Sequence, residues 1–166
     1  PLWSVCEELD FPIATHNVAV PEIPLDAPGG KALAMFSVHL WAEFTLMQLI
    51  VGGVFERHPN LKWVPTEAGW DGPMKCAGML DFTLGASRGA DNRTMGMFGD
   101  ETTNSLTKLP SEYVKQNLWY GVSVGLGPDQ VKMAKELVGV DRIMWGSDYP
   151  HEEGSSPQSK IAIRWA

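Results

Sequence analysis

Three side chains that can bind a metal ion follow short apolar segments of this sequence. His16 and Glu67 each come just after such a segment, and Asp148 lies just past the last one, Ile143 to Gly146. Parallel α/β folds gather their catalytic groups where strands end, so we expect these three side chains to meet at one mouth. A neutral imidazole and carboxylates suit Zn²⁺ or Mn²⁺, which lowers the pKa of bound water and makes hydroxide available near neutral pH. Asp148 would then be both a ligand and the proton acceptor.

Each of these residues also has a simpler structural interpretation. A histidine after a strand is commonly a hydrogen-bonded structural residue, which is the alternative for His16. Asp148 stands within Ser147 to Pro150, a pattern that is typical of a capped turn. Glu67 is supported only by its place after a strand, so spacing alone leaves all three assignments open.

Three further residues are placed to line the mouth of such a site. Among the seven tryptophans, Trp70 and Trp145 have the best positions for touching a substrate. His151 lies three residues past Asp148 and is either a lining residue or an exposed loop histidine. His58 precedes a proline at an expected helix end, where it would serve the helix dipole.

The spacing of apolar residues predicts strands that alternate with helices. Strands are expected at 13–15, 61–65, 118–122 and 143–146, and helices at 4–10, 36–54, 73–84, 110–116 and 128–138. The stretch from Gly85 to Lys108 has no clear period, and we expect a long loop there that covers the site. Such alternation predicts a parallel sheet, because only a long crossover connection returns the chain to a parallel neighbour.

Four strand–helix units amount to half of a TIM (β/α)₈ barrel, since a complete barrel takes about 250 residues. The outer strands of a half barrel would present unpaired N–H and C=O groups to water. A missing N-terminal half, a second copy of the chain or a different closed topology must therefore cover them. Of these, we expect a homo-oligomer.

Composition narrows the function classes. The chain has 166 residues and 44% apolar content, which fits one globular domain. Acidic residues outnumber basic ones, 20 to 13, and the basic residues form no cluster, so we expect no nucleic-acid partner. Two distant cysteines suit a reducing compartment and predict a cytoplasmic protein. The most apolar run, Phe44 to Phe55, is shorter than the roughly 20 residues of a bilayer span, so we expect no membrane association.

Three segments together resemble a known family. They are Arg142 to His151, which contains the string WGSDYPH, Gly52 to Lys62 leading to Glu67-Ala68-Gly69-Trp70, and Glu7-Glu8-Leu9 leading to Pro12 and His16. In order and context they resemble the amidohydrolase-related family, which is similar to aminocarboxymuconate-semialdehyde decarboxylase and its relatives. The resemblance spans nearly the whole chain, residues 1–166, and implies one partial metal-dependent-hydrolase barrel that lacks its N-terminal strands.

The resemblance also implies roles for individual residues. His16 resembles the family's metal-binding histidine after the fifth strand, and Asp148 the acid after the eighth that binds metal and activates water. Glu67 stands where many members have a histidine, which leaves its acid/base role open. The family's His-x-His pair would lie before Pro1. This truncated chain should therefore bind Zn²⁺ or Mn²⁺ weakly or not at all.

These observations lead to one functional hypothesis and two alternatives. The leading hypothesis is a metal-dependent hydrolase that attacks a small organic substrate with metal-activated water. The first alternative is a non-oxidative decarboxylase of a small carboxylated or cyclic substrate. The second is an inactive barrel fragment that assembles with itself or with another chain. The parent protein is expected to be an enzyme, whereas this chain alone need not be active.

Overall fold

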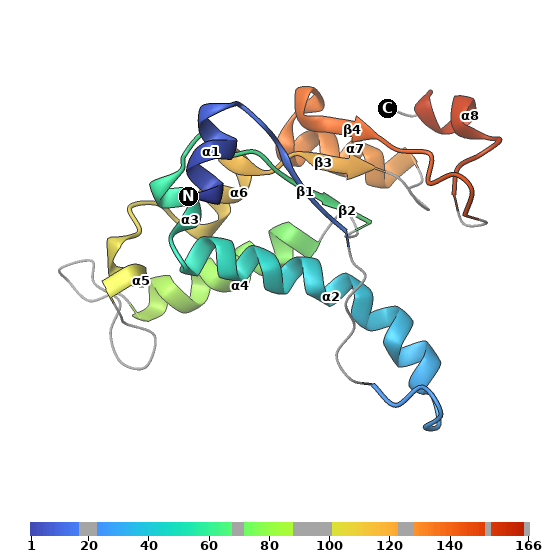
Figure 1. Ribbon diagram of the computed structural model, residues 1–166, viewed down its shortest axis with the longest axis horizontal. Helices are drawn as coiled ribbons and strands as arrows, with labels where there is room; N and C mark the ends of the chain where they lie inside the picture. Colours follow the sequence, from blue (N-terminus) through green and yellow to red (C-terminus); the bar gives the residue numbers. More distant parts are fainter. Residues whose placement is uncertain (17–22, 68–71, 88–100, 123–127, 152–153, 165–166) are drawn as a thin grey trace.

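The computed structural model describes residues 1–16, 23–67, 72–87, 101–122, 128–151 and 154–164 (Figure 1). Within them one sheet contains β1 (Ile13–His16), β2 (Trp63–Thr66), β3 (Tyr120–Val122) and β4 (Ile143–Trp145), in that order. Every neighbouring pair is parallel. The predicted α/β fold with four parallel units, half of a barrel of this type, is therefore confirmed.

Helices precede, connect and follow the strands. They are α1 (Leu2–Glu8), α2 (Gly30–Val51), α3 (Val54–Arg57), α4 (Gly72–Ser87), α5 (Glu101–Ser105), α6 (Pro110–Asn117), α7 (Pro128–Val138), the 3₁₀ helix η2 (Val140–Arg142) and α8 (Ser159–Ile163).

Two expectations about the helices were wrong. The single helix expected at 36–54 begins earlier and is divided at Gly52 and Gly53, and the positive φ of 66° at Gly53 ends the helical path. The expected loop from Gly85 to Lys108 contains the end of α4 and all of α5. The sequence ETTNS of α5 has no apolar period, so periodicity could not reveal it. Residues 88–100 of that expected loop lie outside the described residues.

The core lies between the sheet and the layer of α2, α4 and α6 (Figure 1). Leu46 and Ile50 of α2, Trp63 of β2 and Tyr113 of α6 are all almost fully buried in it. Because successive strand side chains point to opposite faces, Val64 and Thr66 of β2 turn away from these helices. On that other face the sheet borders a hollow of about 320 Å³.

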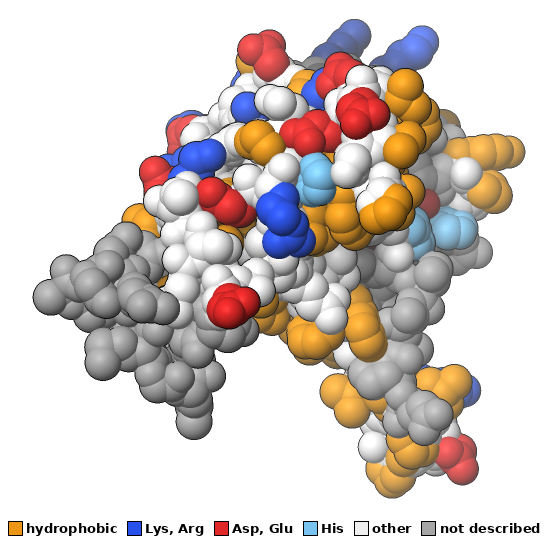
Figure 2. All heavy atoms as spheres, turned by 60° about the vertical axis from the view of Figure 1, so that its left-hand side comes forward, with side chains coloured by type: hydrophobic (Ala, Val, Ile, Leu, Met, Phe, Trp, Pro, Cys, Tyr) orange, Lys and Arg blue, Asp and Glu red, His pale blue; other side chains and the backbone are white. Residues whose placement is uncertain are grey.

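Helix α2 has an exposed apolar face at its N-terminal end, where it projects from the body (Figures 1 and 2). Leu33, Phe36, Leu40 and Phe44 lie at steps of three, four and four, so they share one side of the helix. Phe36 is 76% exposed. A helix that is apolar on both sides is normally covered on both sides, so this face is suited to contact another surface.

Helix α2, with 22 residues and a mean hydropathy of 1.4, is long and apolar enough to cross a membrane by length and composition alone. The apolar run expected from Phe44 to Phe55 therefore overlaps only the C-terminal part of a longer apolar helix. The expected absence of membrane association stays a prediction. A core helix of a globular domain has the same length and composition.

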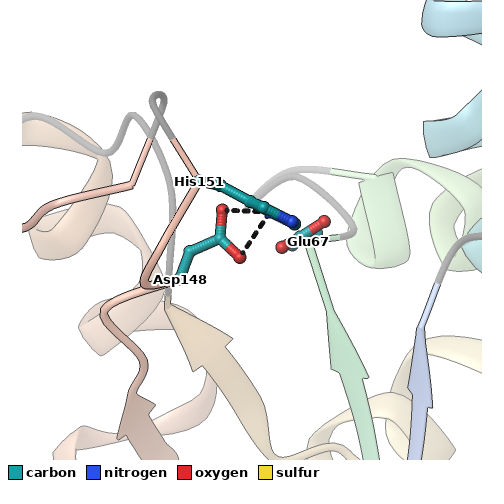
Figure 3. Close-up of side chains that lie close together, drawn as sticks. All are labelled: Glu67, Asp148 and His151. Carbon is teal, nitrogen blue, oxygen red and sulfur yellow. Dashed lines mark hydrogen bonds and ion pairs between the residues drawn. The ribbon is translucent and has the colours of Figure 1, made fainter.

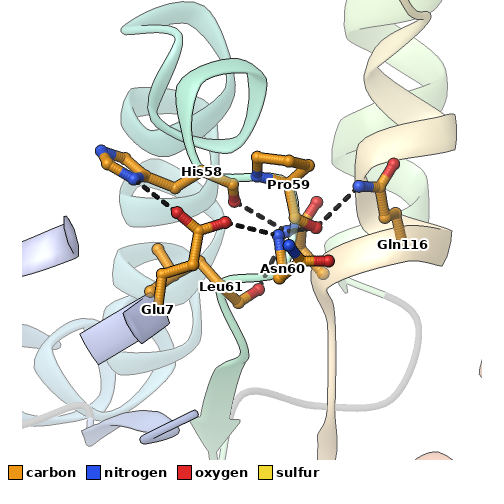
Figure 4. Close-up of polar contacts among 7 residues, drawn as sticks. Glu7, His58, Pro59, Asn60, Leu61 and Gln116 are labelled. Carbon is orange, nitrogen blue, oxygen red and sulfur yellow. Dashed lines mark hydrogen bonds and ion pairs between the residues drawn. The ribbon is translucent and has the colours of Figure 1, made fainter. Parts of the chain in front are cut away.

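A polar network joins the elements at the edge of the sheet where the strands begin (Figure 4). The amide nitrogen of Asn117, at the end of α6, donates to the carbonyl oxygens of Pro59 at 3.1 Å and Leu61 at 2.8 Å. Its side chain is fully buried. The beginning of β2 is thereby fixed to α6.

The same network includes α1. A carboxylate oxygen of Glu7 lies 2.8 Å from Nδ1 of His58, and the other accepts from the backbone N–H of Asn60 at 2.8 Å. His58, which was expected to serve the helix dipole, therefore joins α1 to the chain that precedes β2.

Asn117→Ala should lower the free energy of unfolding by about 2 kcal/mol, because it removes the buried donor to the carbonyl of Leu61, whereas the carbonyl of Pro59 still accepts from the side chain of Gln116. Urea denaturation of both proteins measures the change. Lys132→Ala, on the exposed side of α7, is the control and should change stability by less than about 0.5 kcal/mol. Equal losses in the two variants would contradict a structural role for the Asn117 side chain.

Candidate metal centre

Parallel pairing of β1 with β2 brings two of the predicted site residues together. His16 ends β1 opposite Thr66, and Glu67 follows directly, so both lie at the same edge of the sheet. Nε2 of His16 is 3.1 Å from a carboxylate oxygen of Glu67. Glu67 has a φ of 56°, a left-handed conformation that turns the chain sharply as it leaves the strand.

The loop after β4 supplies two more side chains. Asp148 also has a left-handed φ, 54°, and His151 returns over it, with Nδ1 at 3.1 Å from each carboxylate oxygen of Asp148. The same two residues are also joined through their backbones, since the N–H of His151 donates to the carbonyl of Asp148 at 2.9 Å. Asp148 is well shielded, with 12% of its side chain exposed, whereas that of His151 is 58% exposed.

Close packing of backbone at Gly154 holds this loop in a tight turn. Its N–H donates to the carbonyl of His151 at 3.1 Å. A Cβ at this position would lie 2.7 Å from the carbonyl oxygen of Ser147 and 2.9 Å from that of Asp148. Only glycine fits without moving the backbone that carries Asp148 and His151.

Glu67, Asp148 and His151 form one cluster (Figure 3). Each offers a possible ligand atom, and these atoms all lie within 4.8 Å of one another. Two carboxylates and one imidazole are a donor set that Zn²⁺ and Mn²⁺ accept, so the residues present fit a divalent ion. Two negative charges 4 Å apart repel by about 4 kcal/mol at an effective dielectric constant of 20, which a bound cation would offset.

The other predicted site residues have different positions. Trp145, 37% exposed, borders the hollow on the open face of the sheet together with Thr66 and Gly146. The hollow therefore extends to the strand ends that carry Glu67 and Asp148. Trp70 lies outside the described residues.

Sequence reasoning missed how closely His151 approaches Asp148. A separation of three residues allowed the contact but did not require it, because the turn between them depends on the left-handed conformation of Asp148. The role of Gly154 was missed as well. The string Ser-Asp-Tyr-Pro-His, which combines turn formers with two possible ligands, was the available signal.

Comparison with known proteins identifies related chains. Residues 1–165 match the family described as amidohydrolase. An amidohydrolase from Mycobacterium avium subsp. paratuberculosis is similar at 26% identity and a TM-score of 0.71, over 98% of this chain and 39% of that one.

Two decarboxylases share the fold. A 5-carboxyvanillate decarboxylase from Novosphingobium aromaticivorans, with bound manganese and 3-methoxy-4-hydroxy-5-nitrobenzoic acid, has 21% identity and a TM-score of 0.74, over 100% of this chain and 45% of its own. A 2,6-dihydroxybenzoate decarboxylase from Rhizobium has 18% identity and a TM-score of 0.64, over 99% of this chain and 47% of its own. The chain thus spans less than half the length of each of these structures.

Gly154→Ala should lower the free energy of unfolding by about 1–3 kcal/mol, because the added methyl group forces the carbonyl groups around it apart. Urea denaturation measures the loss, and amide hydrogen exchange should show faster exchange at His151. Gly78→Ala is the matched control, since a Cβ there meets nothing within 4 Å in the middle of α4. That variant should keep its stability or gain up to about 1 kcal/mol. Unchanged stability in Gly154→Ala would show that the loop is not tightly packed.

Proposed function

We propose, on the premise that this chain belongs to the amidohydrolase family, that its cluster at the strand ends is part of a metal-dependent active site. The reaction that we favour is non-oxidative decarboxylation of a small carboxylated organic molecule. The observation that carries the proposal is the convergence of Glu67, Asp148 and His151 within 4.8 Å, with His16 against Glu67.

His16 and Asp148 are the residues that we assign to the metal. They resemble the family's ligands after two different strands, and both offer ligand atoms at the same edge of the sheet. A divalent cation held there would supply positive charge that binds an anionic substrate oxygen and stabilises negative charge as it develops.

Glu67 and Asp148 are the proposed catalytic residues. In decarboxylation the bond between carbon and the carboxylate breaks, its electron pair stays on the carbon, and a proton must reach that carbon as CO₂ leaves. Glu67 is placed to deliver this proton, because its carboxyl group lies 3.1 Å from Nε2 of the proposed metal ligand His16. Asp148 lies on the opposite side of the cluster, where it is proposed to hold the cation whose positive charge stabilises the negative charge that develops on the substrate.

The substrate is proposed to occupy the mouth beside the hollow on the open face of the sheet. Trp145 offers an aromatic surface there, and His151, largely exposed, offers a polar one. Trp70 follows Glu67 by three residues and is proposed as a further contact. A planar, carboxylated molecule fits an aromatic wall next to a cationic site.

Decarboxylation is favoured over hydrolysis by the names of the similar structures. Carboxyvanillate and dihydroxybenzoate decarboxylases are among them, and some of these contain manganese. Hydrolysis remains the second candidate, because the similar Mycobacterium protein is called an amidohydrolase. In that reaction Asp148 would accept a proton from water.

Release of CO₂ from 5-carboxyvanillate and 2,6-dihydroxybenzoate in the presence of Mn²⁺ tests this proposal. We expect turnover by the chain, and a loss of about 100-fold or more in Glu67→Gln and in Asp148→Asn, as for removal of an acid/base group. Lys132→Ala, remote from the site, should retain the parent rate.

The outcomes separate the candidate functions. Turnover of amide or ester substrates without CO₂ release would replace the decarboxylase with a hydrolase. No turnover of either class, by a chain that is folded and supplied with Mn²⁺, would contradict an active site in this chain and favour an inactive fragment that assembles with another chain.

We also propose that the chain forms a homo-oligomer through α2. Support comes from the exposed apolar side of this helix and from the sheet, whose outer strands β1 and β4 each have one neighbour within the described residues. Burying a few large apolar side chains stabilises an interface by about 25 cal/mol per Å².

Phe36→Ser should shift the chain towards monomer, which light scattering after gel filtration measures. Met133→Ser is the matched control, because Met133 is exposed on α7, away from α2, and its loss should leave the assembly unchanged. A parent chain that is monomeric at high concentration would contradict the proposed assembly.

A further inference from the structure

We propose that His151 is a ligand of the divalent cation and joins Glu67, Asp148 and the proposed ligand His16 in a binding set that lies within this chain. The inference rests on the proposed function for the metal dependence of the site. It goes further by assigning a ligand outside the two strand-end positions to which the family resemblance points.

Distances among the three side chains support one shared ion. Metal–ligand bonds of about 2.1 Å place ligands on opposite sides of an ion about 4.2 Å apart. The possible ligand atoms of Glu67, Asp148 and His151 lie within 4.8 Å of one another, so small side-chain rotations suffice to close the set.

The orientation of the imidazole also suits a ligand. Nδ1 of His151 lies 3.1 Å from each carboxylate oxygen of Asp148. Two ligand atoms bound at about 2.1 Å and at right angles to one another are about 3 Å apart, so a cation would fit between Nδ1 and Asp148 in place of the proton. Figure 3 shows the ring of His151 lying between the carboxyl groups of Asp148 and Glu67.

The negative charges of Glu67 and Asp148 also favour a bound cation. Glu67 and Asp148 are both largely shielded, with 23% and 12% of their side chains exposed, and shielding strengthens the repulsion between them. A divalent cation between them would offset this repulsion. A role for His151 in contacting the substrate alone would leave this repulsion unchanged.

Backbone geometry fixes His151 before any ion binds. Its N–H donates to the carbonyl of Asp148, and its carbonyl accepts from Gly154, so the loop presents the ring in one place. A ligand that is already oriented loses little conformational entropy when it binds. Glu67 would help to hold the ion in the substrate-free chain, and its proposed proton-transfer role belongs to the chain with substrate bound.

Mn²⁺ titration of the chain, followed through the electron paramagnetic resonance signal of the free ion, tests this inference. We expect one bound Mn²⁺ per chain, and at least a 10-fold weaker dissociation constant for His151→Gln. The side chain is exposed, so its replacement does not threaten folding. His58→Gln, which removes a histidine at the opposite edge of the sheet, is the matched control and should bind as the parent does.

Pulsed resonance on the bound Mn²⁺ gives a second readout, because nitrogen of a coordinated imidazole modulates the signal. This modulation should weaken or vanish in His151→Gln.

Three outcomes would overturn the inference. If His151→Gln binds Mn²⁺ as tightly as the parent while His16→Gln loses binding, the ion sits on the His16 side, and the proposed function stands without His151 as a ligand. If the parent binds no Mn²⁺, the three residues do not form a site, whatever the CO₂ assay shows. If all variants bind alike, the ion lies elsewhere on the chain.

Discussion

The parallel hydrogen bonding of β1, β2, β3 and β4 is the constraint on which the site depends. Because every strand runs the same way, every strand ends at the same edge of the sheet, and residues distant in sequence become neighbours there. His16 and Glu67 meet across the first pair of strands. The loop after β4 brings Asp148 and His151 to the same edge, although two strands separate β4 from β1.

The opposite edge of the sheet holds the strands in this arrangement. Asn117 and Glu7 satisfy backbone groups of the segment that leads into β2, so α1, α6 and β2 are joined where the strands begin. In a (β/α)₈ barrel, catalytic residues are expected at the edge where the strands end, and stabilising contacts at the edge where they begin.

Two surfaces are left uncovered in the part of the chain that the structure describes. The inner face of the sheet borders an open hollow, and one side of α2 is apolar and exposed. In a closed barrel of this type the inner face is filled by layers of side chains from all eight strands. The four strands present here leave that face accessible, and the chain spans under half the length of the similar solved structures.

The sequence by itself determined the four parallel units, the family and the strand-end positions of His16, Glu67 and Asp148, because apolar periodicity and the order of motifs are local properties. The expectations for α2 and α5 were wrong, because apolar periodicity predicts neither a break at Gly53 nor a short polar helix. Only the tertiary structure decided that His151 lies against Asp148, that Gly154 holds their loop, and that α2 is left exposed. Those features depend on backbone conformations with positive φ and on contacts between segments far apart in the chain, which no local pattern records.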